Sequence, residues 1–249
     1  MLYFLRKFLV PVVKNIQGNS LPNWKKIKSN FYSKPKIDKK ILIATSSGGL
    51  LNQLVSESLF ANALKSKGCS IEFILCDEIL PACVVSMIET CDEKKMLNGK
   101  ISNLCATCFS RAKKNIDSMG FKTHKFSKYI DKDQIRSINL MNFDDYSFKD
   151  IINYEIDSIK VGQHAYSATL RYYGVGDLDV EKNSKKILIK YLKASIISKI
   201  IFENFFNTEK YDHILINSGL YVPQGILTEI AGNKGIFTTT WEFAYKKFG

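Results

Sequence analysis

Ile41-Leu-Ile-Ala-Thr-Ser-Ser-Gly-Gly49 is the stretch of sequence that decides the fold. Its first five residues form a short, mainly apolar run, which is typical of a strand buried on both faces. Two serines and two glycines follow at once, and leucines then recur at helical spacing until Gly68, a helix-ending residue. A second apolar run comes at 71–75. The order strand, loop, helix, strand predicts a right-handed unit with two parallel strands.

The rest of the chain repeats this alternation of apolar runs and helical periodicity. The expected strands are 121–126, 211–216 and 235–239, and the expected helices are 184–206 and 222–231. Two further helical stretches are expected within 79–120, and the segment 131–173 has a polar, helical pattern. We therefore predict an α/β protein with a Rossmann-like parallel sheet flanked by helices.

The predicted domain organisation has two parts. Residues 1–39 form a basic, amphipathic N-terminal lead-in, and residues 40–249 form the Rossmann-like domain, with a cysteine-containing insertion at about 76–120. Because the sequence stops about ten residues after a buried strand, we expect a second domain to be missing after residue 249.

The chain is basic, with 36 Lys and Arg against 24 Asp and Glu and a net charge of +12. This excess fits an anionic partner equally well as a host whose proteins are rich in lysine. Its densest part, residues 25–40, contains lysines and aromatic residues but no Arg, the side chain that contacts base edges bidentately. No nucleic-acid partner is therefore expected.

No run of 18 apolar residues occurs, so no transmembrane helix is predicted. The first 13 residues place apolar side chains around Arg6 and Lys7 and lack the cleavage site of a signal peptide. They fit either packing on the domain or loose contact with a membrane surface. We expect a cytoplasmic protein that is peripheral at the inner face of the cell membrane.

Two loops that follow predicted strands are candidate ligand contacts. The first consists of Ser46, Ser47, Gly48 and Gly49, and the second of Asn217, Ser218 and Gly219. The unpaired N–H groups of a helix N-terminus favour an anion, and glycines let a ligand approach the backbone. The carboxyl ends of parallel strands share one edge of a sheet, so both loops are expected to line one site. The first loop is neither a GxGxxG motif nor a P-loop, and a structural tight turn explains it equally well.

A resemblance to the N-terminal half of GT-B-type glycosyltransferases and of capsule or surface-polysaccharide biosynthesis proteins rests on the segments 41–68, Cys76-Asp77, 80–83, 214–219, 223–225 and 229–235. The resemblance implies two Rossmann-like domains, with the acceptor on the first and most of the nucleotide-sugar on the second. It implies transfer of a sugar from a nucleotide-sugar donor to a glycan or lipid-linked acceptor.

His164 is the candidate base for such a transfer, because imidazole titrates near neutral pH. Arg171 lies seven residues later on the same helix face and is the candidate anion-binding residue. A surface or capped histidine is the alternative for His164. The carboxylates of Glu57 and Glu242 are further candidate bases without a spacing argument.

All six cysteines fall within residues 69–108, and Cys105-Ala-Thr-Cys108 is a CxxC pattern of zinc and redox sites. Cys83, Cys91, Cys105 and Cys108 are the candidate ligands of a zinc ion, and Cys76 is an alternative to Cys91. The competing explanation is a set of small buried thiols. Zinc is the only cofactor that the sequence suggests.

Two other functions compete with sugar transfer. One is a non-catalytic Rossmann-like binding module for an anionic ligand, a nucleotide or a protein. The other is a metal-binding protein built on the cysteine cluster, in which the glycine loop is only a turn.

Overall fold

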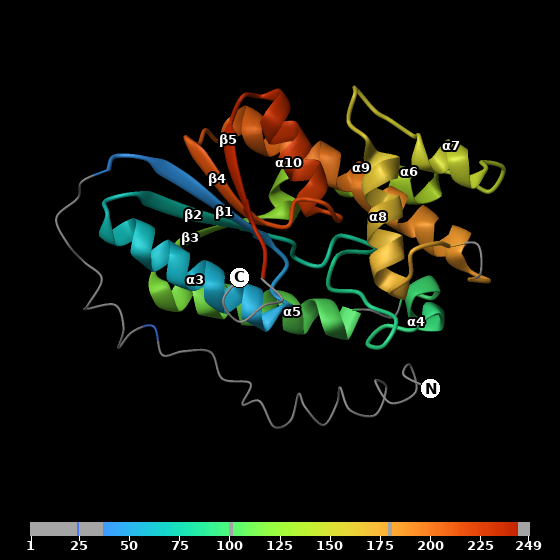
Figure 1. Cartoon of the computed structure of the whole chain (residues 1–249), viewed down its shortest axis with the longest axis horizontal. Helices are drawn as coiled ribbons and strands as arrows, with labels where there is room; N and C mark the ends of the chain where they lie inside the picture. Colours follow the sequence, from blue (N-terminus) through green and yellow to red (C-terminus); the bar gives the residue numbers. More distant parts are fainter. Residues whose placement is uncertain (1–23, 25–36, 100–101, 179–180, 244–249) are drawn as a thin grey trace.

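The computed structural model describes residues 24, 37–99, 102–178 and 181–243 (Figure 1). Each pair of successive strands is joined by one or more helices. Their bounds are β1 Lys40–Ser46, α3 Leu51–Ser66, β2 Ser70–Leu75, α4 Glu93–Leu97, α5 Ser102–Met119, β3 Lys122–Lys125, the 3₁₀ helix η2 Phe126–Tyr129, α6 Lys132–Leu140, α7 Phe148–Ile152, α8 Val161–Tyr173, α9 Ser184–Thr208, β4 His213–Asn217, α10 Gln224–Asn233 and β5 Phe237–Trp241.

The five strands form one parallel sheet in the order β3-β2-β1-β4-β5. In the central strand β1, Ile43 pairs with Phe73 of β2 on one side and with Leu215 of β4 on the other. The prediction of an α/β protein with a Rossmann-like sheet is confirmed.

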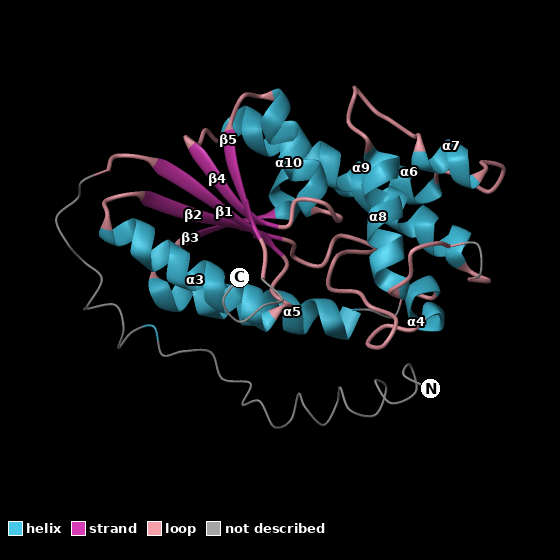
Figure 2. Ribbon diagram, viewed as in Figure 1, coloured by secondary structure: helices cyan, strands magenta, loops and turns pink. Residues whose placement is uncertain are grey.

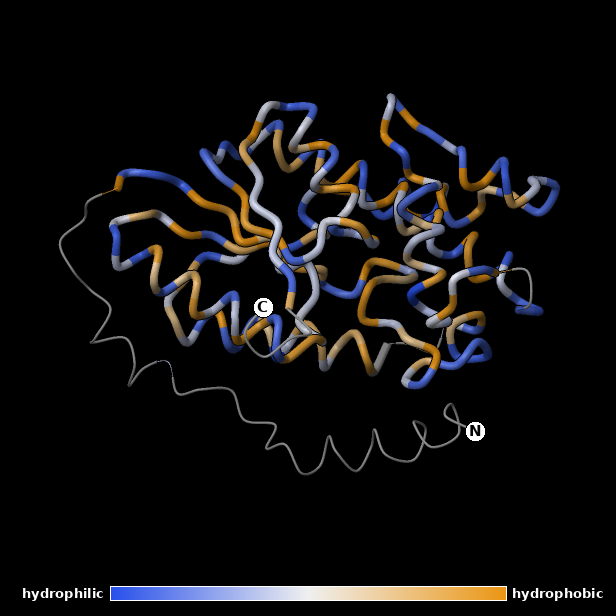
Figure 3. Tube along the Cα trace, viewed as in Figure 1, coloured by the Kyte–Doolittle hydropathy of each residue, from blue (hydrophilic) through white to orange (hydrophobic). Residues whose placement is uncertain are grey.

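Helices cover both faces of the sheet (Figure 2). Helices α3 and α5 lie on one face, and α8, α9 and α10 lie on the other. Successive side chains of β1 point to opposite faces of the sheet. Ile41 and Ile43 belong to the apolar core with α3 and α5, and Leu42 and Ala44 belong to the core with α8, α9 and α10. Apolar residues follow the strands and the inward sides of the helices (Figure 3). A strand buried on both faces explains the unbroken apolar run in the sequence.

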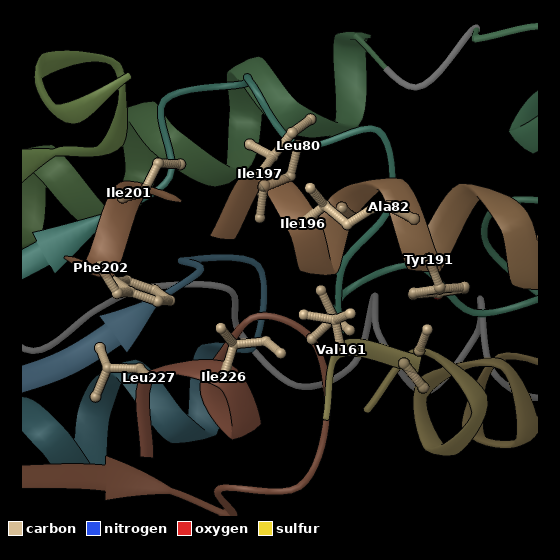
Figure 4. Packing of buried hydrophobic residues seen from close by; sticks show 14 of the residues in the cluster. Leu80, Ala82, Val161, Tyr191, Ile196, Ile197, Ile201, Phe202, Ile226 and Leu227 are labelled. Atoms are coloured by element: carbon tan, nitrogen blue, oxygen red, sulfur yellow. The ribbon is translucent and has the colours of Figure 1, made fainter. Parts of the chain in front are cut away.

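The larger core lies around α9, which is buried along most of its length. Tyr191, Ile197 and Phe202 of this helix face Val161 of α8 and Ile226 of α10 (Figure 4). All five of these side chains are essentially inaccessible to solvent. Burying a side chain of this size contributes about 1.5–3 kcal/mol, so α9 fixes the positions of α8 and α10 at the sheet.

Three local features add detail that the sequence pattern does not give. The segment 131–173 contains three helices, α6, α7 and α8, and Ser147 caps the second of them. The CxxC pattern lies inside α5. Trp24, from the predicted lead-in, is buried and donates a hydrogen bond from Nε1 to Asn115 of α5 at 2.7 Å. At least this residue of the lead-in packs on the domain.

None of the helices in the described residues is both long and apolar enough to cross a bilayer. The N-terminal residues that we expect at a membrane surface lie outside the described residues.

Candidate functional site

The strand order of the sheet reverses between β1 and β4, which makes their carboxyl ends a topological switch point. From β1 the chain adds β2 and β3 on one side, and β4 and β5 then form on the other side. Ligands of open α/β proteins bind at such a point, outside the carboxyl ends of the strands. The loops that leave β1 and β4 therefore define the candidate site.

A serine in a left-handed backbone conformation ends β1, and another directly follows β4. The φ angle of Ser46 is 57° and that of Ser218 is 65°. Glu78, just after β2, is a third non-glycine residue with positive φ, at 72°. Such conformations cost of order 1–3 kcal/mol each and gather at functional sites, where the surrounding structure holds them in place. Three adjacent strands thus lead into strained backbone at one edge of the sheet.

Buried polar atoms without a protein partner gather at the same edge. Among the described residues, five of the seven such side-chain atoms belong to segments at the carboxyl ends of the strands: Ser47 Oγ, Gln53 Oε1, Ser218 Oγ, Gln224 Oε1 and Trp241 Nε1. Leaving a buried donor or acceptor unsatisfied costs about 1–3 kcal/mol. Such a concentration is unusual, because most buried polar side-chain atoms are hydrogen-bonded.

Glu57 of α3 lies directly below the end of β1. Its carboxylate accepts a hydrogen bond from Thr45 Oγ1 at 2.5 Å and another from Gln53 Nε2 at 3.0 Å. The side chain is completely buried, and this burial raises the pKa of Glu57 to about 7, although the two hydrogen bonds oppose the shift. The group therefore changes charge near neutral pH, at the floor of the candidate site.

The two glycines of the first loop are required by the protein's own packing. A Cβ atom on Gly48 would lie 2.3 Å from Ala112 Cβ of α5, and one on Gly49 would lie 2.4 Å from Val85 Cγ1. The backbone N–H of Gly48 also donates to Cys108 Sγ at 3.1 Å. Close contact with α5 and with the loop after β2 thus accounts for both glycines without a ligand.

His164 and Arg171 of α8 lie against the loop after β4. His164 Nδ1 is 2.9 Å from the Leu220 carbonyl oxygen, and Nε2 is 3.0 Å from Glu229 Oε2. Both ring nitrogens are therefore occupied by contacts within the protein. This geometry does not support the predicted base, which stays a prediction.

Arg171 is likewise held by the protein. Its guanidinium donates to the carbonyl oxygen of Val84 and lies over the ring of Tyr221, 5.2 Å from the centroid. These contacts join the loop after β2 to the loop after β4. Its role as an anion-binding residue stays a prediction.

The four cysteines predicted to bind zinc do not lie close enough to do so without movement. Among the described residues, the one group of three or more His, Cys, Asp or Glu with ligand atoms within 4.8 Å of one another is Glu72, His124 and Glu209. Two ammonium groups, of Lys40 and Lys122, already pair with both carboxylates of that group. We regard it as a structural ion-pair network.

A cavity of about 590 Å³ lies elsewhere, beside α4, between charged side chains that include Glu93 and Glu181. Its acidic and basic groups are those of an open, solvated surface, and some pair with each other, as Asp92 does with Lys95. Charged, exposed linings of this kind are common without a ligand, whereas binding pockets are mostly apolar with a few polar groups. The strand ends remain the better candidate.

The fold and site together define an α/β protein with its polar site at the crossover of a parallel sheet. Neither a protein-family model nor a curated protein matches the chain. Among solved structures, a cyclodipeptide synthase from Staphylococcus haemolyticus has a TM-score of 0.35 at 12% identity, over 88% of this chain and 93% of that chain. A cyclodipeptide synthase from Bacillus thermoamylovorans has a TM-score of 0.32 at 12% identity, over 88% and 90% of the two chains. Similarity this low does not carry over a substrate or a reaction.

The prediction of a GT-B-type glycosyltransferase is wrong, because the two similar solved structures are cyclodipeptide synthases, and neither a protein-family model nor a curated protein supports a glycosyltransferase. The nucleotide-sugar and the glycan or lipid-linked acceptor are withdrawn as partners with it. The physical reason lies in the glycine loop on which the resemblance rested. Gly48 and Gly49 are required for helix and loop packing. Their presence therefore indicates a type of fold and does not indicate a particular reaction.

Sequence reasoning did not single out Gln53, Gln224 or Trp241. A glutamine in the first turn of a helix and a tryptophan at the end of a strand carry no pattern of their own. Their importance arises from burial without a partner, which only the packed structure reveals.

Proposed function

We propose that this protein binds a small polar molecule at the carboxyl ends of β1 and β4. The observation that carries this proposal is the gathering there of buried polar atoms that no group among the described residues satisfies. A bound molecule that completes their hydrogen bonds would remove a cost of about 1–3 kcal/mol for each atom. The strained serines at the ends of both strands support the same location.

The unsatisfied atoms suggest the chemistry of the ligand. The hydroxyls of Ser47 and Ser218 both donate and accept, and the indole of Trp241 only donates. The free oxygens of Gln53 and Gln224 accept. None of the five groups is charged, so they match a neutral molecule that carries several hydroxyl or amide groups. A small polyol is the simplest such ligand.

Glu57 gives the site a dependence on pH. Below about pH 7 its carboxyl is neutral, and above this pH a negative charge lies under the end of β1. A charge buried this close to the site polarises the Thr45 and Gln53 groups that contact it. We expect the affinity for a neutral polyol to change across this pH range.

Ligand-observed saturation-transfer NMR tests the proposal with defined probes: glycerol and myo-inositol as polyols, acetamide as an amide and acetate as an anion. We expect a polyol or the amide to receive saturation from the wild-type protein, and the double variant Ser47→Ala/Ser218→Ala to reduce it strongly. Ser195→Ala is the matched control, because Ser195 is also buried with an unsatisfied hydroxyl but lies on α9. Binding of no neutral probe, or equal binding by the double variant, would reject the site.

We also propose that residues 1–13 attach the protein loosely to an anionic membrane surface. The support is the pattern of the sequence, in which Phe4, Leu5, Phe8 and Leu9 surround Arg6 and Lys7. Apolar side chains next to basic ones suit the boundary between acyl chains and anionic headgroups. The net charge of +12 acts in the same direction.

A further inference from the structure

Strand β5 forms one edge of the sheet (Figure 1). It pairs with β4 on its inner side and packs against α10, and in the described part of the chain no strand pairs with its outer side. Proteins usually protect such an edge with lysine or proline, because its unpaired N–H and C=O groups are a template for another strand. The opposite edge strand β3 has this protection, since it begins with Lys122 and ends with Lys125. Strand β5 reads Phe-Thr-Thr-Thr-Trp and has neither a charge nor a proline.

The backbone of β5 shows which of its groups are free to pair with a further strand. The carbonyl oxygen of Trp241 accepts a hydrogen bond from Ser218 N–H at 3.0 Å, so the peptide groups of Trp241 point toward β4. These directions alternate along a strand. The N–H and C=O groups of Thr238 and Thr240 therefore point away from the sheet, where they can form the hydrogen-bonded pairs of a sixth strand.

Aromatic side chains lie exposed along one face of this edge. Phe237 is 67% exposed and Phe243 is 55% exposed. Phe60 of α3 contacts the ring of Trp241 with the centroids 5.3 Å apart, and Trp241 contacts Phe243 at 5.1 Å. Because alternate side chains of a strand point to one face, Phe237, Thr239 and Trp241 all lie on the side from which Phe60 reaches the strand. A partner at this edge would cover exposed aromatic surface as well as backbone.

The order of side chains in β5 matches an antiparallel copy of the same strand. A two-fold axis at Thr239 places Phe237 opposite Trp241 of the second copy, and each aromatic pair occurs twice. The same axis places Thr238 opposite Thr240 of the second copy, so the outward N–H and C=O groups of both strands meet as hydrogen-bonded pairs. The aromatic residues then occupy the positions between these pairs, where opposite side chains come closest and stabilise the sheet. All five residues of β5 are paired in this register.

The charges at the two ends of the strand favour the antiparallel arrangement. Glu242 directly follows β5, and Lys234 ends α10 three residues before β5. Both residues are exposed. Antiparallel pairing brings Glu242 of each copy toward the end of the other strand at which Lys234 lies, whereas parallel pairing brings like charges together.

We propose that two copies of this chain associate through β5, antiparallel about a two-fold axis at Thr239, and form one continuous sheet across the dimer. Phe237 of each copy packs beside Trp241 and Phe60 of the other copy, which accounts for its exposure in the single chain. The dimer is independent of the polar ligand proposed above, because the five unsatisfied buried atoms of that site all belong to one copy.

Sedimentation-velocity centrifugation of the full-length protein tests the proposal at concentrations from about 1 to about 100 µM. We expect a reversible rise from the mass of one chain to the mass of two. Thr240→Pro should remain a single chain throughout, because proline removes an outward N–H and its ring obstructs a further strand. An edge strand tolerates proline where its N–H faces solvent. The melting temperature shows whether the variant is folded.

Phe237→Asp keeps the test valid if Thr240→Pro does not fold, because the Phe237 side chain is mostly exposed in the single chain. Its carboxylate would replace both aromatic pairs, so the dissociation constant of the dimer should rise by at least about tenfold. Leu140→Asp is the matched control, since Leu140 is 77% exposed and lies on α6, away from β5. This control should dimerise as the wild-type protein does.

A charge exchange tests the antiparallel register. At low salt, Glu242→Lys should weaken the dimer, and the double variant Lys234→Glu/Glu242→Lys should restore it, because opposite charges again meet at both ends. A wild-type protein that stays a single chain at every concentration would overturn the proposal. A dimer that both Thr240→Pro and Phe237→Asp leave intact would overturn it as well, because such a dimer would use another surface.

Discussion

At the scale of single residues, Glu57 shows how burial turns an ordinary carboxyl into a group that titrates near neutral pH. Its pKa rises from 4.5 to about 7 because α3 buries it completely under β1. The folded protein therefore holds a proton that the unfolded chain has already released between these two pH values. Stability from this group is complete below pH 4.5 and is lost as the pH rises through about 7.

Glu57→Gln should remove this dependence on pH. Glutamine has nearly the same shape, keeps an acceptor for Thr45 and never carries a charge. The shift of about 2.5 pH units corresponds to about 3 kcal/mol, so the variant should become more stable than the wild-type protein above pH 7 and about equal to it at pH 4.5. Urea unfolding at pH 5, 6, 7 and 8 measures the difference. A parallel fall of both proteins with pH would show that Glu57 does not titrate in this range.

Ser47→Ala should stabilise the free protein. The Ser47 hydroxyl is buried without a partner, so its removal relieves a desolvation cost at the expense of a very small cavity. We expect a gain of up to about 1 kcal/mol, or a melting temperature higher by about 2–4 °C. Differential scanning calorimetry checks it, with Thr45→Val as the contrasting variant, because Thr45 donates to Glu57 and its loss should destabilise. A destabilised Ser47→Ala protein would mean that its hydroxyl has a partner after all.

At the scale of elements, the sequence predicts best those parts whose environment is uniform. The mainly apolar runs that form β1 and β2 lie between two layers of helices, so most of their residues are buried and apolar. The edge strand β5 was expected at 235–239 and lies two residues later, at Phe237–Trp241. Its three threonines give it no clear apolar face, so the sequence pattern does not fix where the strand begins and ends. The CxxC pattern lies within α5, and its four residues alone do not reveal whether they belong to a helix or a turn.

The candidate site was predicted only in part, for the same reason. The order of strands and loops in the sequence placed Ser46, Ser47 and Ser218 at one edge of the sheet. The structure has β1 and β4 as parallel neighbours, so the loops after them do lie at the same edge. The orientation of His164 toward Glu229 depends on how α8 packs against α10, which lies 65 residues away in sequence. Contacts across such separations leave no local pattern.

The contact between the glycine loop and the segment after β2 gives a prediction about these two elements. Gly49→Ala should destabilise the protein by about 1–3 kcal/mol, because its Cβ would lie 2.4 Å from Val85 Cγ1. Val85→Ala removes that methyl group, so the double variant should lose less stability than the sum of the two single variants. A double-mutant cycle from urea unfolding measures the coupling. Additive losses would contradict the direct contact.

At the scale of the whole molecule, the N-terminal residues give a prediction about membranes. A variant that lacks residues 1–13 keeps Trp24, which packs on α5, and should fold normally. It should bind less to vesicles of phosphatidylcholine with phosphatidylserine than the full-length protein does, because it lacks the apolar side chains around Arg6 and Lys7. Co-sedimentation at low and high salt provides the measurement. Equal binding of both proteins would place any attachment on the basic surface of the domain.

The central claim is that a neutral polar molecule completes the hydrogen bonds at the carboxyl ends of β1 and β4. The chain contains two tryptophans, and they form a natural pair of probe and control. Within residues 24, 37–99, 102–178 and 181–243, Trp241 Nε1–H is buried and has no partner, whereas Trp24 Nε1–H donates to Asn115. The most direct measurement is the ¹H–¹⁵N spectrum of the two indole groups during titration with myo-inositol or acetamide. The account predicts a saturable shift of the Trp241 resonance with no change at Trp24, and an unmoved Trp241 resonance, or equal movement of both, would contradict it.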